Sequence, residues 1–165
     1  MVTNEFQRLL LQNAAFTPPF RIVSAIPESV RTRRIPNLPH SIAEELWHIV
    51  FWQDHFLRCA QRKDSAYPRH AQLGWQRLDS LTDAQWQELV ARFETGLTKA
   101  ADIAGQTQLA ERYSTLEEPG SDNGPLTLLE LIANLAVHNA YHLGRIVQLR
   151  QISGNWPPPG GGDTW

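Results

Sequence analysis

Two histidines four positions apart, His138 and His142, lie where the helical periodicity of the chain calls for apolar residues. They belong to a series with alternating steps of four and three, which is typical of a helix face buried in a bundle. The series consists of Leu131, Leu135, His138, His142, Arg145 and Leu149. On a helix the two imidazoles lie about 40° apart around the axis and roughly 6 Å apart along it, so both can reach one point. Because an unpaired buried polar group is costly, this pair predicts a bound divalent metal ion.

A third ligand has to come from another element, because catalytic zinc-type sites use three protein ligands and keep one position open. The remaining histidines are His40, His48, His55 and His70. His48 is the strongest candidate, since it lies in the almost uniformly apolar run 46–52, which indicates a helix buried on much of its surface. His55, two turns later on the same face, is the alternative, whereas His40 and His70 lie in segments that we expect to be exposed.

The residues alone leave a second interpretation of the histidines open. A histidine in a buried helix is often hydrogen-bonded to a carbonyl or a carboxylate and binds no metal. In a metal site, similar partners orient the ligating rings. Glu44, Glu45 and Asn134, each about one turn before a candidate ligand, are candidates for that role. Glu44 has a competing role, because Ser41 and Glu44 form a capping box that begins a helix.

Four helices are predicted to position these residues, at about 4–15, 41–62, 83–103 and 127–152. Ser41 with Glu44 and Thr127 with Glu130 are capping boxes, and Thr82 is a cap for the third helix. Gly105 and Gly154 follow the last residues of the third and fourth helices. Strand signals are nearly absent, so the sequence predicts an all-α four-helix bundle.

The segments between the helices are long. Pro18, Pro19, Pro27, Pro36 and Pro39 disfavour a long helix in the first connection, where we expect only a short turn at 22–25. The connections 63–81 and 104–126 leave room for a crossover. The end of the chain, 154–165, is rich in proline and glycine, and it predicts an extended tail whose Trp156 and Trp165 lie on the bundle.

Composition narrows the class of protein. With 165 residues, 42% of them hydrophobic and 19% charged, the chain fits one soluble domain spanning 1–165. The formal net charge of −2 argues against nucleic-acid binding. The single cysteine, Cys59, cannot form an internal disulfide, which fits the cytoplasm, and we expect it to be a small core residue. No apolar run is long enough for a membrane span, and the charged residues near the N-terminus are not typical of a signal peptide.

Two further groups of residues are noted. Arg31, Arg33 and Arg34 form a basic cluster that either holds the carboxylates or phosphate of an anionic cosubstrate or belongs to a solvated loop. Large aromatic residues in or near the predicted helices are expected to anchor the core or an interface. These are Trp47, Trp52, Trp75 and Trp86.

Three stretches carry a resemblance to a known family. They are Ser41 to Gln53, Leu126 to Ile132, and Val137 to Val147, and the ending that starts at Trp156 is similar to many family tails. Together they resemble the DinB/YfiT-like superfamily over nearly the whole chain. The resemblance implies a bundle of up-down-down-up order, often dimeric, with a metal ion on three histidines. These map onto His48, His138 and His142, and the metal is typically zinc or nickel.

The resemblance also implies a range of functions. Some members resemble thiol S-transferases that use a low-molecular-weight thiol, and many have no assigned reaction. We therefore expect a metal-dependent enzyme, either a thiol S-transferase or a hydrolase, acting on a small-molecule substrate. The alternative is a non-catalytic stress-response or binding module with a structural metal. A homodimer is expected, without nucleic-acid or membrane partners.

Overall fold

The long helices begin at the side-chain caps that the sequence provides. The structure, a computed structural model, describes residues 4–12, 17–61, 71–106 and 126–160. Within them α4 spans Ile42–Ala60, α5 spans Asp83–Ala104 and α6 spans Leu128–Ile152. The Ser41 hydroxyl accepts from the Glu44 amide, and the Glu44 carboxylate accepts from the Ser41 amide at 2.9 Å. Equivalent reciprocal boxes begin α5 and α6, so these predicted starts are confirmed.

The segments before α4 hold shorter helices. The first helix, α1, spans Glu5–Leu11 and ends before the predicted residue 15, while 13–16 lie outside the described residues. Two helices of one turn each, α2 (Pro19–Ile22) and α3 (Glu28–Arg31), were not predicted. Pro19 stands at the first position of α2, where its missing N–H costs nothing. The expected turn near 22–25 directly follows α2.

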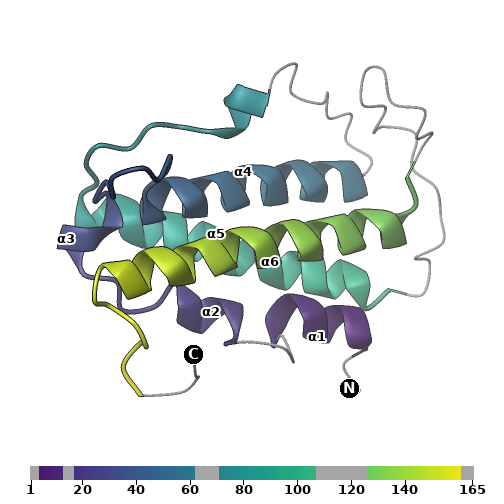
Figure 1. Ribbon diagram of the computed structural model, residues 1–165. Helices are drawn as coiled ribbons and strands as arrows, with labels where there is room; N and C mark the ends of the chain where they lie inside the picture. The colour runs from purple at the N-terminus through teal and green to yellow at the C-terminus, as the bar shows by residue number, and fades with distance from the viewer. Residues whose placement is uncertain (1–3, 13–16, 62–70, 107–125, 161–165) are drawn as a thin grey trace.

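Figure 1 shows the direction of the long helices: α4 and α5 run one way, and α1 and α6 run the other way. α4 packs against both α5 and α6, and α1 closes the opposite side by contacting the same two helices. The described residues therefore form an all-α bundle of up-down-down-up order. The apolar faces meet in one core, to which Leu46, Phe93 and Ile146 each contribute a fully buried side chain.

Two polar side chains at the start of α1 are hydrogen-bonded to the last turn of α5. Beyond capping its own helix, Asn4 donates from Nδ2 to the Ala104 carbonyl oxygen at 2.6 Å, and Gln7 donates from Nε2 to that of Ala101 at 3.1 Å. The last carbonyls of a helix have no partner within it. Asn4 thus supplies a donor to the Ala104 carbonyl, and Gln7 adds a second donor to the Ala101 carbonyl, which also accepts from the Gly105 amide at 3.0 Å.

A buried arginine holds the other end of the bundle. Arg150 is fully buried in the last turn of α6 and donates to the carbonyl oxygens of Ile22 at 2.6 Å, Ser24 at 3.0 Å and Asn155 at 3.0 Å. Its guanidinium lies 5.4 Å from the ring centroid of Trp156. The predicted placement of Trp156 on the bundle is confirmed, and Trp165 lies outside the described residues.

Helices α4 and α5 approach closely at Gly96. A Cβ atom at this position would lie 2.1 Å from Nε2 of Gln53, which is fully buried and donates to the Phe93 carbonyl oxygen at 2.9 Å. We expect Gly96→Ala to destabilise the protein by about 1–3 kcal/mol, because the methyl group displaces a packed side chain and breaks its hydrogen bond. Chemical denaturation measures the change.

Gly144 offers a matched control on α6. A Cβ atom there meets nothing within 4 Å, so Gly144→Ala should be neutral or stabilise by up to about 1 kcal/mol through helix propensity. Equal effects of the two substitutions would contradict the packing argument.

Among the described residues, no helix is both long and apolar enough to span a membrane.

Candidate metal centre

His48 from α4 and His138 and His142 from α6 meet inside the bundle. One nitrogen from each ring can be chosen so that all three lie within 4.8 Å of one another. Nε2 of His138 lies 3.1 Å from Nε2 of His48, and the ring centroids of His48 and His142 are 4.4 Å apart. The structure thus brings together all three histidines that the sequence analysis selected. The described residues contain no other cluster of this kind.

Two of the rings have their second nitrogen held by an acceptor. Nδ1 of His48 donates to the Gly74 carbonyl oxygen at 2.6 Å, and Nδ1 of His142 donates to the Glu45 carboxylate at 2.7 Å. A carbonyl or an ionised carboxylate can only accept, so the proton of each neutral imidazole sits on Nδ1. The Nε2 atoms of His48 and His142 therefore carry lone pairs.

These tautomers fit a cation at the cluster. The lone pair on Nε2 of His48 is 3.1 Å from Nε2 of His138, a contact that needs a proton or a metal ion to be favourable. Within the described residues Nδ1 of His138 is buried without a hydrogen-bond partner, so the polar contact of this ring is on its Nε2 side. The donor set consists of neutral imidazoles, which suit zinc, nickel, copper and iron.

Burial keeps the candidate ligands uncharged. Removal from solvent lowers the pKa of His48 to about 4 and the pKa of His138 to about 4. Both rings are neutral at pH 7, as metal ligation requires.

These lowered pKa values predict acid sensitivity of the metal-free protein. Between pH 6.5 and 4 the unfolded chain binds protons at these histidines while the folded chain does not, so stability falls as the pH falls. We expect the unfolding temperature of chelator-treated protein to be clearly lower at pH 4.5 than at pH 7. In a His48→Gln/His138→Gln variant the same pH change should have a smaller effect. An equal loss in both proteins would contradict this assignment.

Aromatic rings surround the cluster. The Trp75 ring stacks on His48 with centroids 3.8 Å apart and planes 10° apart. Trp52 stands edge-on to His48 and His138, at 6.3 and 6.2 Å, and Tyr141 stands edge-on to His142 at 4.9 Å. Such a surround lowers the local dielectric and strengthens electrostatic interactions at the histidines.

A partly buried ion pair lies behind His142. Glu45 is fully buried and accepts from Nδ1 of His142 and from Nε of Arg145, both at 2.7 Å. Arg145 also donates to the Tyr141 hydroxyl at 3.3 Å. The guanidinium of Arg145 therefore balances the charge of the Glu45 carboxylate behind His142.

The other candidates for orienting the rings have different surroundings. Glu44 accepts from the amides of Ser41 and Leu78 and pairs with Arg34, so it holds loops and no candidate ligand. Asn134 is exposed, so its predicted role is wrong. It lies four residues before His138, and the offset of about 40° around the helix axis places it outside the buried face of α6. Among the described contacts of these three residues, only Glu45 reaches the ring of a candidate ligand, and that ring, His142, is on α6.

The remaining histidines lie outside the cluster. His55 is buried and lies with Nε2 3.7 Å from Sγ of the buried Cys59, so it is not the third member. His40 is half-buried, contrary to its expected exposure, because it stacks on Trp75 with centroids 3.6 Å apart. His70 lies outside the described residues.

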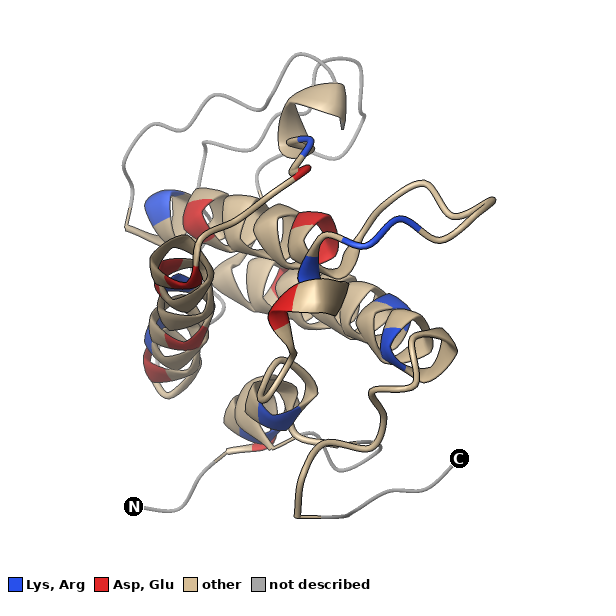
Figure 2. Ribbon diagram, turned by 90° about the vertical axis from the view of Figure 1, so that its left-hand side faces the viewer, with Lys and Arg blue, Asp and Glu red and all other residues tan. Residues whose placement is uncertain are grey.

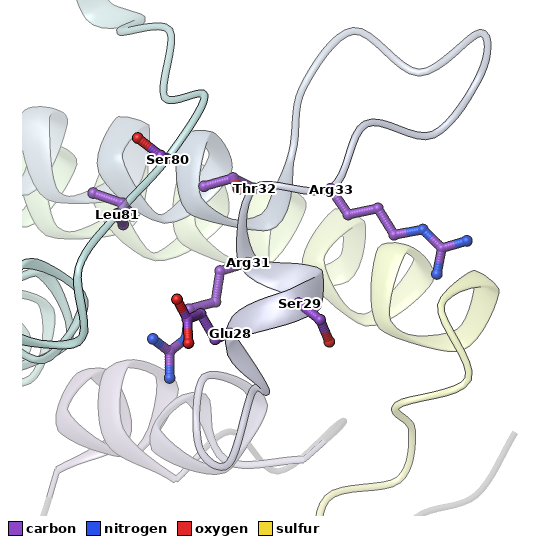
Figure 3. A pocket seen from close by; sticks show the side chains of 7 residues that line it. All are labelled: Glu28, Ser29, Arg31, Thr32, Arg33, Ser80 and Leu81. Carbon is purple, nitrogen blue, oxygen red and sulfur yellow. The ribbon is translucent and has the colours of Figure 1, made fainter.

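The predicted basic cluster is divided by the fold. Arg31 is buried and pairs with Asp83 at 2.5 Å, and Arg34 pairs with Glu44. Figure 3 shows Arg33 extending away from Arg31 at the edge of an open groove of about 620 Å³. The groove is lined by Glu28, Ser29, Arg31, Thr32, Arg33, Ser80 and Leu81. The three guanidiniums do not converge, which removes the basis for an anion site.

Basic and acidic residues are interspersed over the described part of the chain. In Figure 2 the basic positions are spread over several helices and lie beside acidic ones. This distribution forms no basic face in that view, as expected for a chain of net charge −2.

A family model of the DinB superfamily matches residues 20–146. The chain belongs to the DinB superfamily. The match begins in α2 and extends into α6, so it contains the three histidines and Glu45. No significant similarity was found to a curated protein or to a solved structure. A DinB-like bundle with a three-histidine cluster is compatible with metal binding.

Proposed function

We propose that this DinB-superfamily protein is a metal-dependent enzyme that holds one divalent ion, zinc or nickel, on His48, His138 and His142. The observation that carries the proposal is the convergence of three histidines from two helices, two of them with Nδ1 held by an acceptor so that Nε2 carries the lone pair. The substrate is a small molecule, and the reaction is a thiol S-transfer or a hydrolysis. The cytoplasmic location and the homodimer stay predictions.

The number of ligands favours a catalytic centre over a structural one. Structural zinc sites are closed by four protein ligands, whereas catalytic sites use three and keep a position for water or substrate. Within the described residues no fourth histidine, cysteine, aspartate or glutamate joins the cluster. Both oxygens of Glu45, the nearest carboxylate in the hydrogen-bond network, are engaged by Nδ1 of His142 and by Arg145.

The groups around the cluster orient two of the histidines and shield the cluster from water. A divalent ion on neutral imidazoles acts as a Lewis acid and lowers the pKa of a bound water or thiol. Glu45 orients His142 and stabilises the proton on its Nδ1, and the Gly74 carbonyl does the same for His48. Trp52 and Trp75 both pack against the His48 ring and shield it from water. Arg145 forms an ion pair with the buried Glu45 carboxylate.

Metal analysis and chelation test the proposal. Purified protein should contain about one divalent ion per chain, and removal of the ion should leave the helical content intact, because the apolar core is complete without it. The metal-loaded protein should then turn over electrophiles in the presence of low-molecular-weight thiols, or hydrolyse small esters or amides, and the chelated protein should not.

Two outcomes would overturn the proposal. Metal-free protein as purified, with no uptake of zinc or nickel, would remove the site. Unfolding on chelation would indicate the alternative, a structural metal, since such ions supply much of the folding free energy.

A further inference from the structure

A connecting segment lies directly against the histidine cluster. It follows the short helix η1 (Ala71–Gly74), and we call its residues 74–78 the strap. The Gly74 carbonyl oxygen accepts from Nδ1 of His48 at 2.6 Å, and the Leu78 amide donates to the buried Glu44 carboxylate at 3.0 Å. Both ends of the strap are thus hydrogen-bonded to side chains of α4 that are one turn apart.

Trp75 lies between these two hydrogen bonds and forms the middle of a three-ring stack. On one face it covers His40, with centroids 3.6 Å apart and planes 5° apart. On the other face it covers His48, with centroids 3.8 Å apart and planes 10° apart. Both faces of the indole are occupied, so Trp75 presents neither of them to a ligand. Its contacts are with the protein's own rings, including an edge contact to His142 at 5.7 Å.

The stacked Trp75 ring restrains the plane of the His48 imidazole, which the hydrogen bond to Gly74 does not do. A single hydrogen bond at Nδ1 fixes one point of the His48 imidazole but leaves its plane free to tilt. The Nε2 lone pair lies in the ring plane, so a tilt would turn it away from His138 and His142. A large ring stacked parallel on His48 opposes that tilt.

Gly74 allows the strap to lie this close. A Cβ atom there would lie 3.0 Å from Nε1 of Trp52 and 3.5 Å from Cε1 of His48. The absence of a side chain brings the Gly74 carbonyl to His48 and aligns the Trp75 ring with it.

We propose that Trp75, supported by His40, is a positioning residue that fixes the plane of His48 so that Nε2 faces the other two histidines. The metal-dependent part of this inference rests on the proposed function. The positioning itself exists without a metal, because each contact that carries it lies within the chain.

Cobalt binding tests the role of the stack. With Co²⁺ as the probe, we expect Trp75→Ala to bind about tenfold more weakly than wild type, in the range found when orienting partners of metal ligands are removed. The visible absorption of bound Co²⁺ should change as its ligand geometry changes. Trp75→Phe keeps a stacking ring and should restore the spectrum and most of the affinity.

Trp47→Ala is the matched control. Trp47 is a half-buried tryptophan next to His48 in α4, and it stacks on Phe51 with centroids 5.4 Å apart. This variant should keep the wild-type cobalt spectrum even if it is less stable. Wild-type affinity and spectrum in Trp75→Ala, or equal losses in Trp75→Ala and Trp47→Ala, would overturn the inference.

A metal-free measurement separates this inference from the proposed function. In chelator-treated protein, NMR should show that the Nδ1 proton of His48 exchanges faster with solvent in Trp75→Ala than in wild type and Trp75→Phe. An unchanged exchange rate would overturn the positioning role. Absence of cobalt binding in wild type would instead overturn the proposed function and leave the NMR result as the test of the stack.

Discussion

Replacing His142 by alanine is expected to weaken zinc or nickel binding by more than about 100-fold. The loss of an outer partner alone costs about 10–100-fold, and His142 supplies one of the three candidate ligand atoms found in the described part of the chain. The substitution also leaves the buried Glu45 carboxylate with Arg145 as its remaining partner. Metal content after dialysis and competition with a chromophoric chelator measure the change.

His55→Ala controls for the loss of a buried histidine. His55 is buried in α4, as His48 is, but its ring contacts Cys59 and Trp52, and it is not in the cluster. This variant should keep full metal occupancy. Full occupancy in His142→Ala would show that the ion is held elsewhere.

Arg150→Ala is expected to destabilise the protein by about 3–5 kcal/mol, the largest stability change among these predictions. The substitution removes the donor of three hydrogen bonds. The carbonyl oxygens that accept them, including that of Ile22, then lose the Arg150 guanidinium as a partner. It also creates a cavity under Trp156, since Arg150 is among the largest fully buried side chains. Urea unfolding followed by circular dichroism gives the free energy.

Arg77→Ala is the comparison for Arg150. Arg77 pairs with Asp79 at 2.9 Å, but both side chains are about 70% exposed, so its removal should cost less than about 1 kcal/mol. Arg150→Lys keeps the charge and loses the planar fork, and it should lie between the two. A change of under 1 kcal/mol in Arg150→Ala would mean that the tail and α2 are held by other contacts.

The starts of the long helices and the His138–His142 pair could be predicted from the sequence, because both depend on local spacing. Ser41 with Glu44 and Thr127 with Glu130 form boxes within four residues, and they begin α4 and α6 at the predicted places. His138 and His142 share a face for the same reason. His48 required a further inference, from the apolar run around it to a buried position in the bundle.

The partners of the histidines depend on contacts between distant segments, which spacing does not reveal. Glu45 reaches His142 across 97 residues, whereas the spacing argument considered only its own helix. Trp75 was expected, like the other tryptophans, to anchor the core or an interface. It stacks on His48, a contact that its place in a connection with no periodic pattern does not reveal. A tryptophan and a glycine side by side in a proline-poor connection were the available signal for a loop held against the bundle.

The separation of the histidines along the chain sets the order of assembly. His48 and His138 are 90 residues apart, so the trio exists only after a long loop has closed, at a considerable entropic cost. In the unfolded chain a metal ion could bind only the local pair His138 and His142, which would hold it more weakly than all three histidines. Under the proposed function, loading would therefore follow the docking of α4 on α6, and a bound ion would act as a reversible cross-link between these two helices.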